Sequence, residues 1–480
     1  MATTFKFERR ATEFLQAWSR SEIRKPLVIR GARQVGKSFL VRLLAEKEDL
    51  DLFEVNLERL PGLDGVFQEP NPTRILAALE LRLRKRADPD RTLLFLDEIQ
   101  AVPEAFRSLR YFHEEWPALR VIAAGSLLDL VLQDHEYSIP VGRIEYVHLL
   151  PLTFEEFLCG RDNEPAVRLL TRYRPGLEIA KAEHEAMMAE FRTFVALGGM
   201  PEVVSTFLRT GSFLEAERVK GSLLATYRED FAKYRRRIPE ERLRKILDAV
   251  PRRIGSKLRY VDIDPNERSR DLSLALDLLC RARLVHRIHH ASGQGVPLGA
   301  SRDERRFKVL FLDVGLVSTA CGLDAMALDE FPDLLRVNEG ALAEQFVGQE
   351  LLGSLPHGRT PELHFWMREA KSSTAEVDYL LEHGPRVVPI EVKAGRTGRL
   401  RSLHQFVRAH HPPLAVRLNS DTPSDLLIGE GSTSTRLLSL PLYFAGQVQR
   451  ILTVIEAAGK ESVSAAGQPG RLHRPTADDQ

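Results

Sequence analysis

The sequence predicts an α/β fold in which a parallel sheet carries a phosphate-binding loop at one edge. Three apolar runs support this prediction, because each reads as a buried strand that ends in small or polar residues: 27–30, 92–96 and 119–124. Strands buried on both faces read as continuous apolar runs, and ligands lie beyond the carboxyl ends of parallel strands. The residues that follow these runs are therefore the first candidates for a functional site.

The first run continues into residues 31–38, which have the pattern G-x-x-x-x-G-K-S, and then into an amphipathic segment that reads as a helix. Gly31 and Gly36 allow backbone N–H groups to curl around an anion, and the helix directs its positive end at the phosphates. In this pattern Lys37 bridges the outer phosphates and the Ser38 hydroxyl ligates Mg²⁺. The segment predicts a site for ATP and Mg²⁺.

The second run ends in Asp97 and Glu98, and the third ends in Gly125 and Ser126. We expect Asp97 to lie beside Ser38 and to hold Mg²⁺, as in P-loop enzymes generally. Glu98 is suited to polarising the attacking water, although an acidic pair after a strand is often a solvated turn. Ser126 could orient this water or contact the γ-phosphate; alternatively it begins a loop or caps a helix over residues 127–132. Residues 50–58 fit a fourth strand only loosely.

Together these motifs resemble those of a prokaryotic AAA+-type ATPase family, whose members usually carry a C-terminal domain of unknown function. The segments that carry the resemblance are residues 31–38, 96–100, 124–126, 141–143, 149–157, 197–201, 227–231, 311–316 and 391–393. The resemblance covers most of the chain. It implies an AAA+-like ATPase with a helical lid, which binds ATP and hydrolyses it.

Arg143 belongs to a Gly-Arg pair that precedes the Pro-Leu-Thr-Phe segment in this family. A guanidinium is permanently charged and meets phosphate oxygens through two donors, which suits it to transition-state charge in phosphoryl transfer. One interpretation is a sensor or finger arginine that acts within the subunit or across an interface of an oligomer. The other is an arginine that bridges the core to the lid.

Composition gives broad limits on the class of protein. The chain has 480 residues and a net charge of +1, so it has room for several domains and no overall attraction to nucleic acid. No apolar run approaches the roughly 20 residues that span a bilayer, and the N-terminus lacks a secretory signal. The three cysteines have no metal-like spacing. We therefore expect a cytoplasmic protein that does not cross a membrane.

Five segments are predicted: an ATPase core (1–153), a helical lid (154–234), a winged-helix-like segment (235–300), a nuclease-like domain (301–458) and a disordered tail (459–480). Within the lid, residues 191–197 read as a helix that Gly198 ends. Residues 208–260 contain 15 basic and 7 acidic residues, or +8. Helices at 241–250 and 271–280, followed by a strand at 284–290, suggest a winged helix that binds DNA or, alternatively, a protein partner.

Two strands, 376–381 and 387–393, form a predicted hairpin in the last third of the chain. Alternation along a strand places Glu391 and Lys393 on one face, and the hairpin brings Asp378 close to Glu391. Glu344, on a helix over residues 338–352, adds a third acid. Such a group can hold a divalent metal and position water at a phosphodiester.

The D-x₁₂-E-x-K pattern resembles restriction-endonuclease-like nucleases, which implies metal ligation by Asp378 and Glu391 and assistance by Lys393. The open alternative is a nuclease-like fold kept only for binding. The whole chain thus predicts a Mg²⁺-dependent ATPase that couples its nucleotide state to DNA binding or processing. The alternative function is a nucleotide-controlled switch for a protein partner, with an inactive nuclease-like fold.

Overall fold

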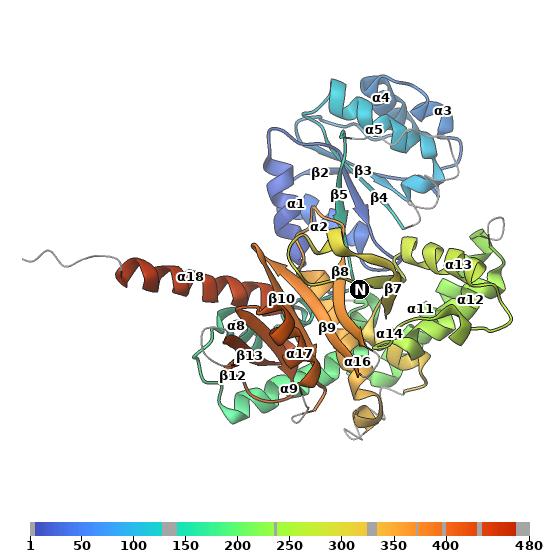
Figure 1. Ribbon diagram of the computed structural model, residues 1–480. Helices are drawn as coiled ribbons and strands as arrows, with labels where there is room; N and C mark the ends of the chain where they lie inside the picture. Colours follow the sequence, from blue (N-terminus) through green and yellow to red (C-terminus); the bar gives the residue numbers. More distant parts are fainter. Residues whose placement is uncertain are drawn as a thin grey trace, which may run out of the picture.

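The computed structural model describes residues 5–126, 142–234, 238–323, 334–370, 373–395, 400–429 and 434–466. These residues form two sheets, one of five strands and one of eight, with helices around and between them (Figure 1). Among the described helices, none combines the length and the apolar character that a membrane crossing requires.

The five-stranded sheet is parallel throughout and has the order β2-β3-β4-β1-β5. Its strands are β1 (Leu27–Arg30), β2 (Asp51–Asn56), β3 (Thr92–Asp97), β4 (Arg120–Gly125) and β5 (Glu145–His148). The helices around it are α1 (Arg10–Arg20), α2 (Lys37–Lys47), α3 (Asp64–Phe67), α4 (Pro72–Leu83) and α5 (Pro103–Glu115). The parallel sheet and the three strands predicted from apolar runs are confirmed, and β5 is an additional strand.

Alternation along the buried strands divides this sheet between two apolar layers. Leu27 and Ile29 of β1 pack in the cluster that includes α1 and α2, whereas Val28 packs in the cluster of α3, α4 and α5. All three side chains are fully buried. Because both faces are covered, the strands read as continuous apolar runs, and only their carboxyl edge is left for a ligand.

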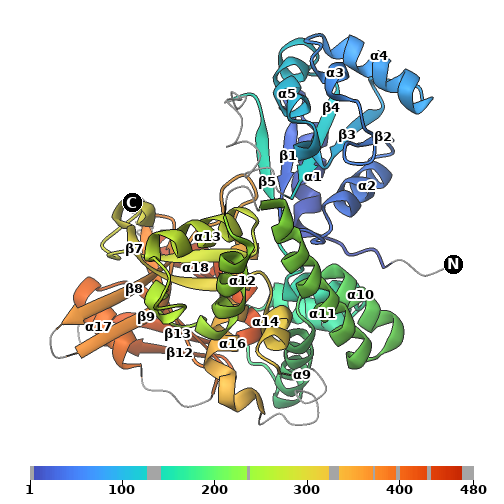
Figure 2. The same cartoon turned by 90° about the vertical axis from the view of Figure 1, so that its right-hand side faces the viewer.

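The predicted lid segment is helical. Its helices are α7 (Phe154–Gly160), α8 (Glu164–Arg172), α9 (Lys181–Leu197), α10 (Pro201–Thr210) and α11 (Phe213–Asp230). Helix α9 ends where the sequence predicted, since Gly198 follows it with a φ of 77°. Figure 2 shows α11 running alongside α10 toward the base of the first sheet.

The eight-stranded sheet has the order β12-β13-β11-β10-β9-β8-β6-β7. Its strands are β6 (Val285–His290), β7 (Asp303–Phe311), β8 (Leu363–Ala370), β9 (Ser373–His383), β10 (Arg386–Val392), β11 (Leu414–Asn419), β12 (Ser424–Ile428) and β13 (Thr435–Pro441). The helices near it are α12 (Glu240–Ala249), α13 (Ser269–Arg281), α14 (Val314–Ala320), α16 (Leu334–Ser354), α17 (Arg401–His410) and α18 (Val448–Ala466). The predicted hairpin is present as β9 and β10.

Two predicted boundaries differ from the structure. The boundary at residues 300 and 301 falls inside the hairpin of β6 and β7, and β6 also pairs with β8, so this hairpin is part of the eight-stranded sheet. Helix α18 continues to Ala466, into the tail predicted as disordered. The remainder of that tail, residues 467–480, lies outside the described residues. Sequence patterning indicated strand β6 but gave no sign that it would pair with β8, 75 residues later in the chain.

One apolar cluster extends from the N-terminal segment through the lid to the C-terminal sheet. Phe346 of α16 illustrates this continuity, because its ring packs edge-on against Phe154, Phe191 and Phe194 of the lid helices. Ring centroids in these pairs are 4.8 to 6.3 Å apart. The lid and the C-terminal sheet are therefore packed as one body rather than joined by a linker.

Candidate functional site

The phosphate loop leaves β1 at the carboxyl edge of the sheet and leads directly into α2. Gly36 precedes the helix with a φ of 96°, a left-handed conformation that glycine adopts without a steric penalty. The Lys37 ammonium donates to the carbonyl oxygens of Ala32 (2.8 Å) and Gly31 (3.1 Å). Burial lowers the pKa of Lys37 to about 8, although the charges of Glu98 and Asp97 oppose this shift. The Lys37 side chain thus contacts the backbone of its own loop. When a nucleotide binds, we expect its ammonium to contact the phosphates instead.

Asp97 comes next to the phosphate loop, as the sequence predicted. The Ser38 hydroxyl donates to Asp97 Oδ2 over 3.0 Å, and Asn56 Nδ2 lies 3.4 Å from the same oxygen. Burial raises the pKa of Asp97. A hydroxyl and a carboxylate at this separation are the oxygen ligands that Mg²⁺ takes beside a nucleotide, so these residues fit that ion.

Glu98 and Ser126 both lie at the carboxyl edge of the sheet. Glu98 has a left-handed backbone (φ 51°), and its carboxylate accepts from the Gln100 amide. Ser126 follows β4, in which Gly125 pairs with Arg30, so it lies level with the start of the phosphate loop. Ser126 Oγ is buried and has no hydrogen-bond partner among the described residues. The helix considered for residues 127–132 lies outside that part of the chain.

Arg143 is not close to the phosphate loop of its own chain. It precedes β5, whose first residue pairs with Leu27 at the opposite end of β1 from Gly31. Its guanidinium pairs with Glu114 of α5 over 2.9 Å. A finger role within the subunit therefore does not agree with the structure, and the bridge that Arg143 makes is to α5 rather than to the lid. A role across an interface would need a second copy of the chain.

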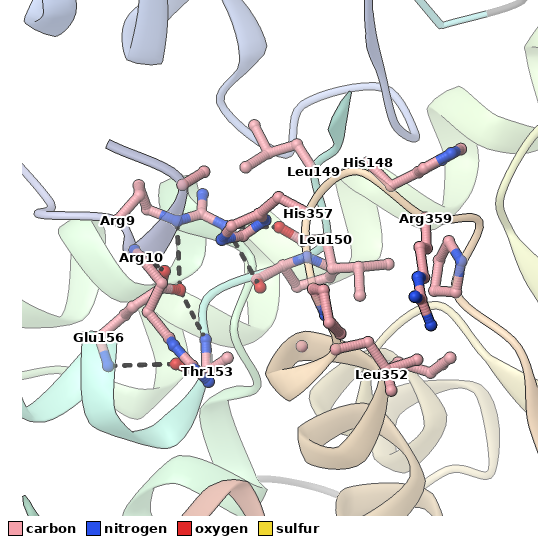
Figure 3. Close-up of a pocket in the computed structure, with 16 residues that line it drawn as sticks. Arg9, Arg10, His148, Leu149, Leu150, Thr153, Glu156, Leu352, His357 and Arg359 are labelled. Atoms are coloured by element: carbon pink, nitrogen blue, oxygen red, sulfur yellow. Dashed lines mark hydrogen bonds and ion pairs between the residues drawn. The ribbon is translucent and has the colours of Figure 1, made fainter. Parts of the chain in front are cut away.

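Arg9 is a residue near the site that the sequence analysis missed. Its guanidinium is buried and donates to the carbonyl oxygens of Val35 in the phosphate loop (3.0 Å) and Leu150 after β5 (2.6 Å). It also pairs with Glu156 of α7 over 3.1 Å (Figure 3). One side chain thus connects the loop, the end of β5 and the first lid helix. An isolated arginine near the start of the sequence carries no pattern that would reveal these contacts.

The last turn of α11 contacts the outside of the phosphate loop. Arg33 pairs with Asp230 over 3.0 Å, and the Tyr227 hydroxyl donates to the carbonyl oxygen of Arg33 over 3.0 Å. These residues and Ser126 line a small cavity together with Phe231, Ala282 and Leu284. The loop, the lid and the turn between α13 and β6 therefore meet at one place.

The predicted C-terminal residues do come together. Asp378 Oδ2 accepts from the backbone N–H of Val392 (2.7 Å), and Lys393 pairs with Glu391 over 2.6 Å. Burial and the Asp378 charge raise the pKa of Glu391 to about 7. The sequence analysis did not anticipate Lys308 of β7, which lies among these acids.

The Lys308 ammonium lies 2.8 Å from Glu344, 2.9 Å from Glu376 and 3.7 Å from Asp378. Within the described residues, no set of three or more acids, histidines or cysteines is arranged as a metal site. Two of the three carboxylates expected to hold a metal, those of Glu344 and Asp378, thus lie beside Lys308, and the third, that of Glu391, pairs with Lys393.

Many cations of the basic segment are neutralised by nearby acids. Pairs at 2.8 to 3.0 Å join Arg228 to Asp248, Arg242 to Glu267 and Asp271, and Lys245 to Asp264. The segment therefore presents less unbalanced charge than its sequence count suggests. Its densest point, residues 235–237, lies outside the described residues.

A parallel sheet with a phosphate loop after β1 and an aspartate beside the loop serine defines a P-loop nucleotide-binding protein. Residues 23–158 match the family model described as an AAA domain, so this part of the chain is similar to AAA-type P-loop domains. Residues 188–327 and 339–436 match two domains of unknown function, DUF8612 and DUF4143. These two matches do not test the predicted nuclease-like fold.

No curated protein matches the chain. Solved structures similar to it include the ORC2 protein of Aeropyrum pernix in ADPNP and ADP complexes, at 13% identity and a TM-score of 0.34, covering 66% of this chain and 94% of that one. The RuvB Holliday junction branch migration motor of Thermotoga maritima matches at 16% identity and a TM-score of 0.28, covering 58% and 89%. TM-scores this low carry no inference about function.

Proposed function

We propose that this protein is a Mg²⁺-dependent ATPase whose nucleotide state alters the contacts of the lid. The observation that supports this most directly is the hydrogen bond between Ser38 and Asp97, because it joins the magnesium ligand of the loop to the acid of β3. The neighbouring Lys37 is buried within the loop, where phosphate oxygens can replace the carbonyl oxygens that it now contacts.

Each residue has a defined part in this proposal. Lys37 binds the outer phosphates, while Ser38 and Asp97 hold Mg²⁺, which offsets the charge of the phosphates when it is bound. Glu98 orients the attacking water and accepts its proton. The unpartnered hydroxyl of Ser126 donates to the γ-phosphate or to that water.

The test compares nucleotide binding and steady-state hydrolysis in Lys37→Ala, Glu98→Gln and a control, Glu115→Gln, which alters an exposed acid at the end of α5. Lys37→Ala should lose binding, and Glu98→Gln should bind ATP but hydrolyse it at least about 100-fold more slowly. The control should match the wild type. Hydrolysis by Glu98→Gln at the wild-type rate would rule out its role, and unchanged binding by Lys37→Ala would rule out the site.

A second element of the proposal is DNA binding by the winged-helix-like segment. The order α12, α13 and the hairpin of β6 and β7 supports it, since winged helices place two helices before a hairpin. ATP hydrolysis would then rise on addition of duplex or single-stranded DNA, and binding would weaken steeply with salt. Hydrolysis that is indifferent to DNA, with no salt-sensitive binding, would favour the protein-partner switch instead.

A further inference from the structure

Lys308 occupies the point on which the acids of the C-terminal sheet converge. It extends from β7, while Glu344 comes from α16 and both Glu376 and Asp378 come from β9. The Lys308 side chain is 1% exposed. A charge buried this deeply is stable only beside opposite charges, which Glu344, Glu376 and Asp378 supply.

Each of the four carboxylates already has a close partner at one of its oxygens. Lys308 contacts one oxygen each of Glu344 and Glu376, the second oxygen of Asp378 accepts from the Val392 backbone, and Lys393 holds one oxygen of Glu391. The other Glu391 oxygen, Oε2, is buried and has no hydrogen-bond partner among the described residues. A divalent cation placed among these carboxylates would be repelled by the Lys308 ammonium unless it displaced that group.

A second observation, independent of these charges, concerns access to the cluster. Residues 255–258 lie across it: Lys257 forms a β-bridge with Lys308, and the Leu258 N–H donates to the Phe307 carbonyl over 3.2 Å. Gly255 lies so close that an added Cβ would be 3.0 Å from a Glu344 oxygen. A phosphodiester that approached from this side would have to displace the segment before it reached Glu344.

We propose that Lys308 is the permanent cation of this cluster, so that the C-terminal domain neither binds a divalent metal there nor cleaves phosphodiesters. The cluster instead joins β7, within residues 188–327, to α16 and β9, within or next to residues 339–436. The two matched regions are thereby held together by buried ion pairs. The nuclease-like pattern of Asp378, Glu391 and Lys393 is accordingly a structural feature in this chain.

Mn²⁺ binding to the full-length chain without nucleotide tests the proposal, with free Mn²⁺ followed by electron paramagnetic resonance. Wild type and Asp378→Asn should bind Mn²⁺ identically, because the cluster of the wild type takes none. Lys308→Met should gain one Mn²⁺ per chain, at least ten-fold tighter than any shared site, and Lys308→Met/Asp378→Asn should lose it again. Wild-type binding that Asp378→Asn abolishes would overturn the proposal.

Lys308→Met leaves several buried acids without a cation and can fail to fold. In that case the comparison of the wild type with Asp378→Asn and Glu391→Gln decides alone. The same proteins are incubated with Mn²⁺ and duplex or single-stranded DNA, and cleavage by the wild type that either variant loses would also refute the proposal. ATP hydrolysis, measured in parallel, should be unchanged in Asp378→Asn, which separates this proposal from that of the nucleotide site.

Discussion

Nucleotide binding should take up a proton, because Lys37 has a lowered pKa only while its loop holds no phosphate. In the free protein this pKa is about 8, and beside phosphates it should return at least to its ordinary value of 10.5. The ammonium is then about 90% protonated at pH 7 and about 10% at pH 9 in the free protein, but almost fully protonated in the complex at both. Uptake should therefore rise from about 0.1 proton at pH 7 to about 0.9 at pH 9.

Isothermal titration calorimetry with a non-hydrolysable ATP analogue measures this uptake as the dependence of binding enthalpy on the ionisation enthalpy of the buffer. Affinity should also fall about ten-fold between pH 7 and pH 9, since the complex requires the charged lysine. Lys37→Arg is the matched control, because a guanidinium stays protonated throughout and should show no uptake. A wild-type uptake near zero at pH 9 would refute the assignment of a buried, partly neutral Lys37 to the phosphate site.

Two further predictions concern stability. Burial raises the pKa of Glu350 from 4.5 to about 8, so between pH 4.5 and pH 8 the folded state holds a proton that the unfolded state has lost. The free energy of unfolding therefore falls as the pH rises through this range, by at most about 5 kcal/mol. Glu350→Gln should flatten this dependence in urea denaturation from pH 5 to pH 8, and parallel curves for both proteins would contradict it. Arg9→Met should lower the free energy of unfolding by about 3–5 kcal/mol, because it leaves Glu156 without its buried partner. The control Arg9→Lys, which keeps the charge, should lose less stability. A loss below about 0.5 kcal/mol in Arg9→Met would show that the pair contributes little.

The sequence predicted the parallel sheet and the position of Asp97 beside the loop because these features are local. Residues 31–38 fix their own backbone through glycine, and the strands that place Asp97 and Ser126 are continuous apolar runs because both of their faces are buried. The hairpin of β9 and β10 was predictable for the same reason, since alternation and a short turn set which acids share a face. In each case neighbours in the sequence determine the geometry.

What the sequence did not indicate comes from contacts between distant segments. Strand β5 has four residues, only one of them buried, so it lacks an apolar run. Arg9 and Lys308 are ordinary cations until the fold brings carbonyl and carboxylate oxygens to them from segments 26 to 141 residues away. Arg143 shows the converse, because a motif position shared with a family did not place it near the phosphates of its own chain.

The packing also limits how a bound nucleotide could move the rest of the molecule. Since one apolar cluster runs from the N-terminal segment to α18, a wholesale hinge between the lid and the C-terminal sheet would expose a large buried surface. The ion pair between Arg33 and Asp230 can change at smaller cost, because both side chains are partly exposed to solvent. Any effect of ATP on the distant domains should therefore begin where α11 meets the phosphate loop.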